Sequence, residues 1–108
     1  MASLTNLGAV IAHALEWETF LQEAAAAQGD EDQARASRQR AAELARIRRE
    51  AVSEMILEPL SGIEPIDLGG LSLTEAQARL AAFYAHAAER VTIPAAGRAL
   101  RRLARRCA

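Results

Sequence analysis

The chain has 108 residues, of which 51% are apolar, 4% are aromatic and 25% are charged. This length supports one compact domain, and the apolar share argues against wholesale disorder. A near balance of 13 basic and 14 acidic residues argues against a dedicated nucleic-acid binder, and a single cysteine excludes an internal disulfide scaffold. No apolar run approaches the roughly 18 residues of a membrane span, and no basic region precedes the first apolar stretch. We therefore expect a cytoplasmic protein.

Alanine dominates the composition and predicts helices. It supplies 26 of the 108 residues, and all 13 basic residues are arginine. Alanine has the highest helix propensity because ordering it costs no side-chain entropy. Since a GC-rich genome would also favour alanine and arginine, we assign no function to the absence of lysine.

The first half of the chain predicts two long helices. Residues 3–27 form the first, with Ser3 or Thr5 as its cap and Gly29 after its end. Residues 31–57 form the second, ahead of Pro59. The apolar stripe of the first helix contains Leu7, Ile11, Ala14, Leu21 and Ala25, and that of the second contains Ala34, Ala41, Leu44, Ala51 and Met55.

Residues 59–71 are the long irregular segment, and they are apolar. They contain two of the three prolines and three of the six glycines. Such a segment is expected to cross a helical bundle and pack on it, and docking of a partner is the alternative.

The second half predicts two further helices, over residues 73–91 and 95–107. Ser72 or Thr74 caps the first of them, and Pro94 suits the start of the second. Their apolar stripes contain Leu73, Leu80, Tyr84, Ala87 and Val91, then Ala96, Leu100, Leu103 and Cys107. The chain is thus predicted to be a single all-α domain over residues 1–108, a four-helix bundle of two helical hairpins joined by an apolar crossover.

Polar residues also fall on these apolar stripes. Glu18 lies on the stripe of the first helix and Arg48 on that of the second. Because an unpaired buried charge costs several kcal/mol, we predict that Glu18 and Arg48 form a buried pair.

The hairpin arrangement and three of its motifs resemble the ferritin-like, rubrerythrin-type four-helix bundle. Gln77 and Tyr84 have the seven-residue spacing of that family's glutamate and tyrosine. After Leu44-Ala45 and Leu103-Ala104, however, Arg48 and Cys107 stand where the family has glutamates. The resemblance implies the fold and an iron site, but these departures predict a bundle without di-iron chemistry.

Other catalytic or metal-binding arrangements are weak. His13 with Glu16, and His86 with Glu89, share helix faces and could bind zinc loosely or across a subunit interface, while Glu18 is the one carboxylate in register for iron. Arginines beside Cys107 would lower the pKa of its thiol, but no histidine is near it in sequence to act as a base.

The sequence contains no glycine-rich phosphate loop. We expect no catalytic residue and no bound cofactor, with iron or another divalent metal as the alternative.

The last helix has a basic face. It carries five arginines and no acid: Arg98, Arg101, Arg102, Arg105 and Arg106. This face could contact nucleic acid or an anionic surface. The lack of aromatic stacking residues instead favours pairing with the acidic second helix of the same chain or of a neighbouring subunit, through Glu43, Glu50, Glu54 and Glu58.

Trp17 and Phe20 give the first helix a second apolar face, so it needs a second neighbour, which in a small bundle is often another copy. We therefore expect a non-enzymatic interaction or assembly module that self-associates through Trp17 and Phe20. It could also hold an amphipathic helix of another protein. The alternatives are a ferritin-like metal protein and a regulator whose arginine-rich end binds nucleic acid.

Overall fold

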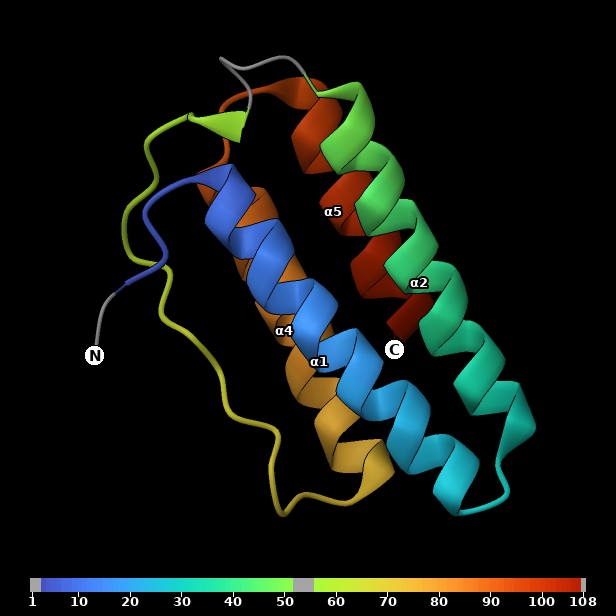
Figure 1. Ribbon diagram of the computed structural model, residues 1–108. Coiled ribbons are helices and arrows are strands. Elements are labelled where there is room, and N and C mark those ends of the chain that lie inside the picture. The colour runs from blue at the N-terminus through green and yellow to red at the C-terminus, as the bar shows by residue number, and fades with distance from the viewer. Residues whose placement is uncertain (1–2, 52–55, 108) are drawn as a thin grey trace.

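The computed structural model describes residues 3–51 and 56–107. Within these ranges the protein contains four helices, and its only β-type pairing is an isolated bridge between Asn6 and Pro59 (Figure 1). The helices are α1 (Leu7–Ala27), α2 (Glu31–Glu50), α4 (Leu73–Arg90) and α5 (Pro94–Cys107). The predicted all-α bundle is confirmed.

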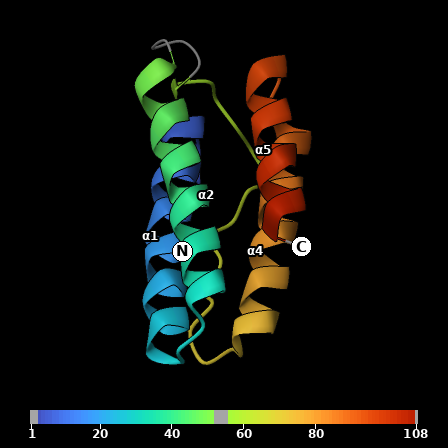
Figure 2. The same cartoon turned by 90° about the vertical axis from the view of Figure 1, so that its right-hand side faces the viewer.

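The helices form two hairpins that pack against each other. α1 pairs with α2, and α4 pairs with α5, while α1 also contacts α4 and α2 contacts α5. Figures 1 and 2 show that α1 and α5 occupy diagonally opposite corners of the bundle. Because α2 and α4 run in the same direction, the chain must return along the length of the bundle between them, and residues 59–71 do this (Figure 1).

Local side-chain chemistry sets where most helices begin and end. Asn6 caps α1 by accepting from the amide of Ala9 at 2.8 Å, so neither Ser3 nor Thr5 is the cap. Gly29 follows the end of α1 in a Schellman motif. Its φ of 77° is a backbone conformation that favours glycine. Ser72 is the cap of α4, and Pro94 begins α5.

The predicted end of the second helix near Leu57 is wrong. α2 ends at Glu50, and Ala51 already has an extended conformation with φ −70° and ψ 136°. Side-chain periodicity continues past Glu50 in the sequence, but periodicity reports which face could be buried and not where the backbone turns. Of the predicted stripe, Ala51 is half-buried and Met55 lies outside the described residues.

The core is built from small and branched aliphatic side chains of all four helices. The predicted stripes of α1 and α5 are fully buried. In α4, Leu80, Tyr84 and Ala87 are buried, but the terminal Leu73 and Val91 are half-buried. The buried stripe of α2 differs from the predicted one and contains Ala34, Ser37, Arg40, Leu44 and Ile47.

The crossover packs on the bundle. Leu60, Ile63 and Leu68 are buried in the common core. Its backbone also pairs with the segment before α1, since the amide of Leu4 donates to the carbonyl of Ile63 and the amide of Leu60 to that of Thr5, both at 2.9 Å. These apolar side chains are therefore part of the protein's own core and are not available to dock a partner.

Two aromatic side chains of α1 hold the middle of the crossover. Trp17 Nε1 donates to the carbonyl of Ile66 at 2.9 Å, and the amide of Ile66 donates to His13 Nε2 at 2.9 Å. His13 must therefore be neutral at Nε2 to accept this bond. Burial lowers the pKa of His13, although the charge of Glu16 acts in the opposite direction.

No helix among the residues described is sufficiently long and apolar to cross a membrane.

Stability should depend on the protonation of His13. Its folded-state pKa lies below its ordinary value of about 6.5, so the unfolded chain binds the proton more readily. The free energy of unfolding should therefore fall as pH drops through this range. His13→Gln keeps an acceptor oxygen for Ile66 without titrating, so urea unfolding of the variant between about pH 7.5 and 5.5 should show a smaller fall. Parallel curves for the two proteins would contradict this assignment.

Candidate functional site: a buried polar cluster

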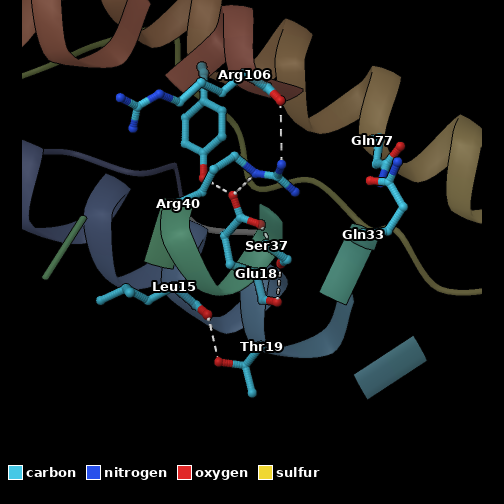
Figure 3. Close-up of polar contacts among 9 residues, drawn as sticks. Leu15, Glu18, Thr19, Gln33, Ser37, Arg40, Gln77 and Arg106 are labelled. Carbon is cyan, nitrogen blue, oxygen red and sulfur yellow. Dashed lines mark hydrogen bonds and ion pairs between the residues drawn. The ribbon is translucent and has the colours of Figure 1, made fainter. Parts of the chain in front are cut away.

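The most unusual chemistry of the protein is a charged cluster at the centre of the bundle (Figure 3). Glu18 is 0% exposed and Arg40 is 2% exposed. Arg40 Nε donates to Glu18 Oε2 at 2.7 Å, and the Tyr84 hydroxyl donates to the same oxygen at 2.7 Å. Ser37 Oγ lies 2.7 Å from both Glu18 Oε1 and the Glu18 carbonyl oxygen, and its single proton serves one of them at a time. Both carboxylate oxygens therefore have donors.

Three helices bring these side chains together. Glu18 comes from α1, Ser37 and Arg40 lie one helical turn apart on α2, and Tyr84 comes from α4. Arg40 Nη1 also lies 3.5 Å from the carbonyl oxygen of Arg106 on α5. The cluster thus connects the two hairpins, since Glu18 and Arg40 belong to one and Tyr84 and Arg106 to the other.

Arg40 and Tyr84 are each held in one protonation state. Burial alone would lower the pKa of Arg40, but the hydrogen bond and charge of Glu18 outweigh it and raise that pKa. Burial, with the Glu18 charge, raises the pKa of Tyr84 well above its usual range, so the phenol stays a donor. Arg40 therefore stays charged and Tyr84 stays neutral at ordinary pH.

Cys107 adjoins this cluster and is not an activated thiol. Burial raises the pKa of Cys107 to about 11, with a further contribution from the Glu18 charge, while Arg40 acts in the opposite direction. The neighbouring arginines were expected to lower this pKa, but Arg105 and Arg106 are exposed, and Arg106 faces Glu43 of α2. A thiol that is protonated and buried is a poor nucleophile.

The predicted pair of Glu18 with Arg48 is wrong, although the burial of Glu18 is confirmed. Arg48 is exposed, and Arg40 binds Glu18 instead. The prediction assigned the wrong side of α2 to the core, because it used the half-buried Ala41 and the non-helical Ala51 to define the buried face. Arg40, four residues before Leu44, lies on the true buried face.

These side chains do not suit the di-iron centre that the ferritin-like resemblance implies. Glu18 is the only carboxylate in the cluster, and its oxygens are already bonded to a guanidinium, a phenol and a hydroxyl. A fixed guanidinium repels a metal cation from the same carboxylate. Gln77 does not reach Glu18 and bonds to Gln33 of α2 instead. Of the family-like pair, only Tyr84 belongs to the cluster.

The histidine pairs are not brought together as metal sites. His13 is occupied by the backbone of Ile66, and His86 Nε2 lies 2.7 Å from the carbonyl oxygen of Gly62. The neighbouring Glu16 and Glu89 are exposed. Over residues 3–51 and 56–107, no three histidine, cysteine, aspartate or glutamate side chains converge on one point.

The basic face of α5 divides into two parts. Arg102 and Arg106 approach Glu43 of α2 at 3.2 and 3.8 Å, as pairing with the acidic helix predicts. Burial alone would raise the pKa of Glu43, but Arg102 and Arg46 together lower it. Arg98, Arg101 and Arg105 are exposed and make no ion pair with any described residue.

The other acids proposed as partners of this face do not reach it. Glu50 pairs with Arg46 of its own helix at 3.0 Å. Glu58 is buried and accepts from the amide of Thr92 at 2.6 Å and from its hydroxyl. Glu54 lies outside the described residues. A groove of about 250 Å³ lies between α2 and α5 next to Glu50, with Ile47, Ala95 and Ala99 among its lining residues.

The two residues of the predicted interface differ in their environment. Trp17 is half-buried beneath the crossover, whereas Phe20 is 41% exposed. Their rings meet edge to face with centroids 5.1 Å apart. The crossover thus already provides the neighbour that Trp17 requires, and Phe20 is the part of this face that is free.

The comparisons with known proteins give no match, whether to a protein-family model, to a characterised protein or to a solved structure. The ferritin-like resemblance therefore rests on the sequence motifs alone.

Sequence reasoning missed Ser37 and Arg40. The usable signal was their spacing, because Ala34, Ser37, Leu44 and Ile47 continue one helical stripe on which Arg40 also lies. The prediction used the alanines of α2 to choose its buried face, but these alanines occur on several faces of the helix.

Removing the charge of Arg40 should destabilise the fold far more than removing that of Arg48. Arg40→Met leaves Glu18 buried without its counter-charge and should lower the free energy of unfolding by about 3–5 kcal/mol. Arg48→Met changes an exposed side chain and should have an effect within about 0.5 kcal/mol. Adding Glu18→Gln to Arg40→Met removes the stranded charge and should recover part of the loss. Urea unfolding measures all three, and a larger effect at Arg48 would contradict the assignment.

The Cys107 thiol should react slowly in the folded protein. At about pH 8 a free cysteine is partly thiolate, whereas burial and a pKa of about 11 keep Cys107 protonated. Colorimetric titration with a disulfide reagent should give slow labelling in buffer and rapid labelling in denaturant. Equal rates under the two conditions would show that α5 does not protect this thiol.

Proposed function

We propose that this protein is a non-enzymatic helical module that self-associates through the exposed side of α1 around Phe20. Exposure of Phe20 is the observation that carries the proposal. The Phe20 ring already contacts Trp17 edge to face and is still 41% exposed. It can bury more apolar area only against another molecule. Phe20 and Leu57 are the two exposed large hydrophobic residues in the described part of the chain.

The buried cluster supports a structural role for the charged core. Its carboxylate is inaccessible, its donors are internal to the chain, and its neighbouring thiol is not activated. Chemistry at Glu18 would require a substrate to displace Arg40 or Tyr84 from inside the bundle. The same contacts disfavour the ferritin-like alternative, in which Glu18 would bind iron.

Binding of nucleic acid remains a second candidate, and the unpaired arginines of α5 are the observation that favours it. Clusters of exposed arginine side chains commonly contact the phosphates of nucleic acids. The exposed aromatic side chain that could stack on a base, however, lies on α1, at the opposite corner of the bundle from α5 (Figure 2).

Self-association should depend on Phe20. Sedimentation velocity and native mass spectrometry of the untagged protein should show concentration-dependent oligomers, and Phe20→Ala should raise the dissociation constant by about tenfold because it removes the interfacial ring. Trp17 is unsuitable for this test, since it also holds the crossover. Leu57→Ala is the matched control and should not change the association.

A strictly monomeric wild-type protein would overturn the proposal. The same spectra report bound ions, so stoichiometric iron would revive the ferritin-like alternative and contradict the structural role given to Arg40.

A further inference from the structure

The outer surface of α5 carries a stripe of three arginines without partners in the described structure. Arg98, Arg101 and Arg105 follow one another at intervals of three and four residues, which keeps them on one side of the helix. Arg102 and Arg106 lie to one side of this stripe, where they face Glu43 of α2. The three arginines are exposed on the outer side of the helix, with the Arg101 guanidinium beside Gly97, and form what we term the arginine stripe.

The outer surface of α1 carries a complementary stripe. Glu16, Phe20 and Glu23 follow one another at intervals of four and three residues, and all three are exposed. Neither Glu16 nor Glu23 forms an ion pair with any residue of the described ranges. We term these three residues the acidic stripe.

The spacing of the two stripes matches when the helices run antiparallel. Glu16 and Glu23 are seven residues apart, as are Arg98 and Arg105, so each pair spans about 10 Å along its helix. Aligning Glu16 with Arg105 and Glu23 with Arg98 leaves one residue in the middle of each stripe.

In that alignment the central residues coincide. Phe20 is four residues from Glu16, and Arg101 is four residues from Arg105, so Phe20 lies opposite Arg101. A guanidinium over the face of an aromatic ring is an attractive arrangement. A parallel alignment keeps the two charge pairs but sets Phe20 and Arg101 one residue out of step. The antiparallel arrangement is therefore favoured.

We propose that the partner of the α1 face is the arginine stripe on α5 of a second copy of this chain. The inference rests on the proposed self-association and names the surface that completes it. Two charge pairs flank a central contact between Phe20 and Arg101. Exposed ion pairs are individually weak, so the contact needs all three positions and should weaken with salt.

The placement of the stripes makes this contact head to tail. α1 and α5 occupy diagonally opposite corners, so their outer surfaces face away from each other (Figures 1 and 2). One neighbour cannot cover both stripes of the same copy. Each copy therefore binds two neighbours, which gives a ring or an open chain rather than a two-fold dimer.

Charge reversal on each stripe, followed by mixing, tests the proposal. Arg98→Glu with Arg105→Glu makes both stripes acidic, and Glu16→Arg with Glu23→Arg makes both basic. Each double variant alone should raise the dissociation constant by about tenfold or more, measured by sedimentation velocity at about 0.05 M NaCl. An equimolar mixture restores opposite charges at every contact and should regain oligomers, in which native mass spectrometry finds both chains.

The matched control reverses two exposed arginines elsewhere. Arg38 on α2 and Arg79 on α4 are exposed and have no ion pair among the described residues, so Arg38→Glu with Arg79→Glu gives the same net charge as the α5 variant. This variant should associate like the wild type. Circular dichroism verifies that every variant is folded.

The outcomes separate this inference from the proposed function. If the wild type associates through Phe20 but the reversed variants associate equally well, or the mixture does not recover, the α5 assignment is wrong and the self-association stands. If the wild type is monomeric even at low salt, both fail. If α5 reversal abolishes binding of a labelled oligonucleotide and leaves association unchanged, the arginine stripe serves nucleic acid and the proposal is overturned.

Discussion

A carboxylate without access to water must find its counter-charge inside the protein, and this requirement organises the centre of the bundle. Glu18 has three side-chain donors from two other helices, and each of them would itself be costly to bury alone. Replacing such a cluster with aliphatic side chains is often neutral or stabilising, so the cluster need not add to the stability of the fold. Here it joins Glu18 and Arg40 of the first hairpin to Tyr84 of the second, and so it fixes the position of one hairpin relative to the other.

The alanine content makes that link more important. Small side chains let helices approach closely, but they offer few distinctive shapes with which to define one register. Directional hydrogen bonds at 2.7 Å fix the relative positions of the helices, which an alanine-rich core does not do by shape alone. The crossover is fixed in a similar way, because Trp17 and His13 bind the carbonyl and the amide of the same residue, Ile66.

Much of this fold follows from periodicity in the sequence, and the site does not. Every residue of the predicted stripes of α1 and α5 is buried, because aliphatic residues recur there at helical spacing, although Val10, Gly97 and Ala99 are buried as well. α2 has alanines on several faces, so its orientation was ambiguous and the buried arginine was assigned to Arg48 instead of Arg40. The helix end at Glu50 could not be read because the helical pattern continues beyond it. Identification of Ser37 as a donor needed three-dimensional contacts between α1 and α2.

The sequence separation of the cluster has a consequence for the order of folding. Glu18 and Arg40 are 22 residues apart within one hairpin, whereas Tyr84 is 66 residues from Glu18. Loop-closure entropy is smaller for the nearer pair, and contacts at short range in sequence form faster. The first hairpin can therefore neutralise its own carboxylate before the second one docks. The growing chain then never has to bury Glu18 while its counter-charge is still distant.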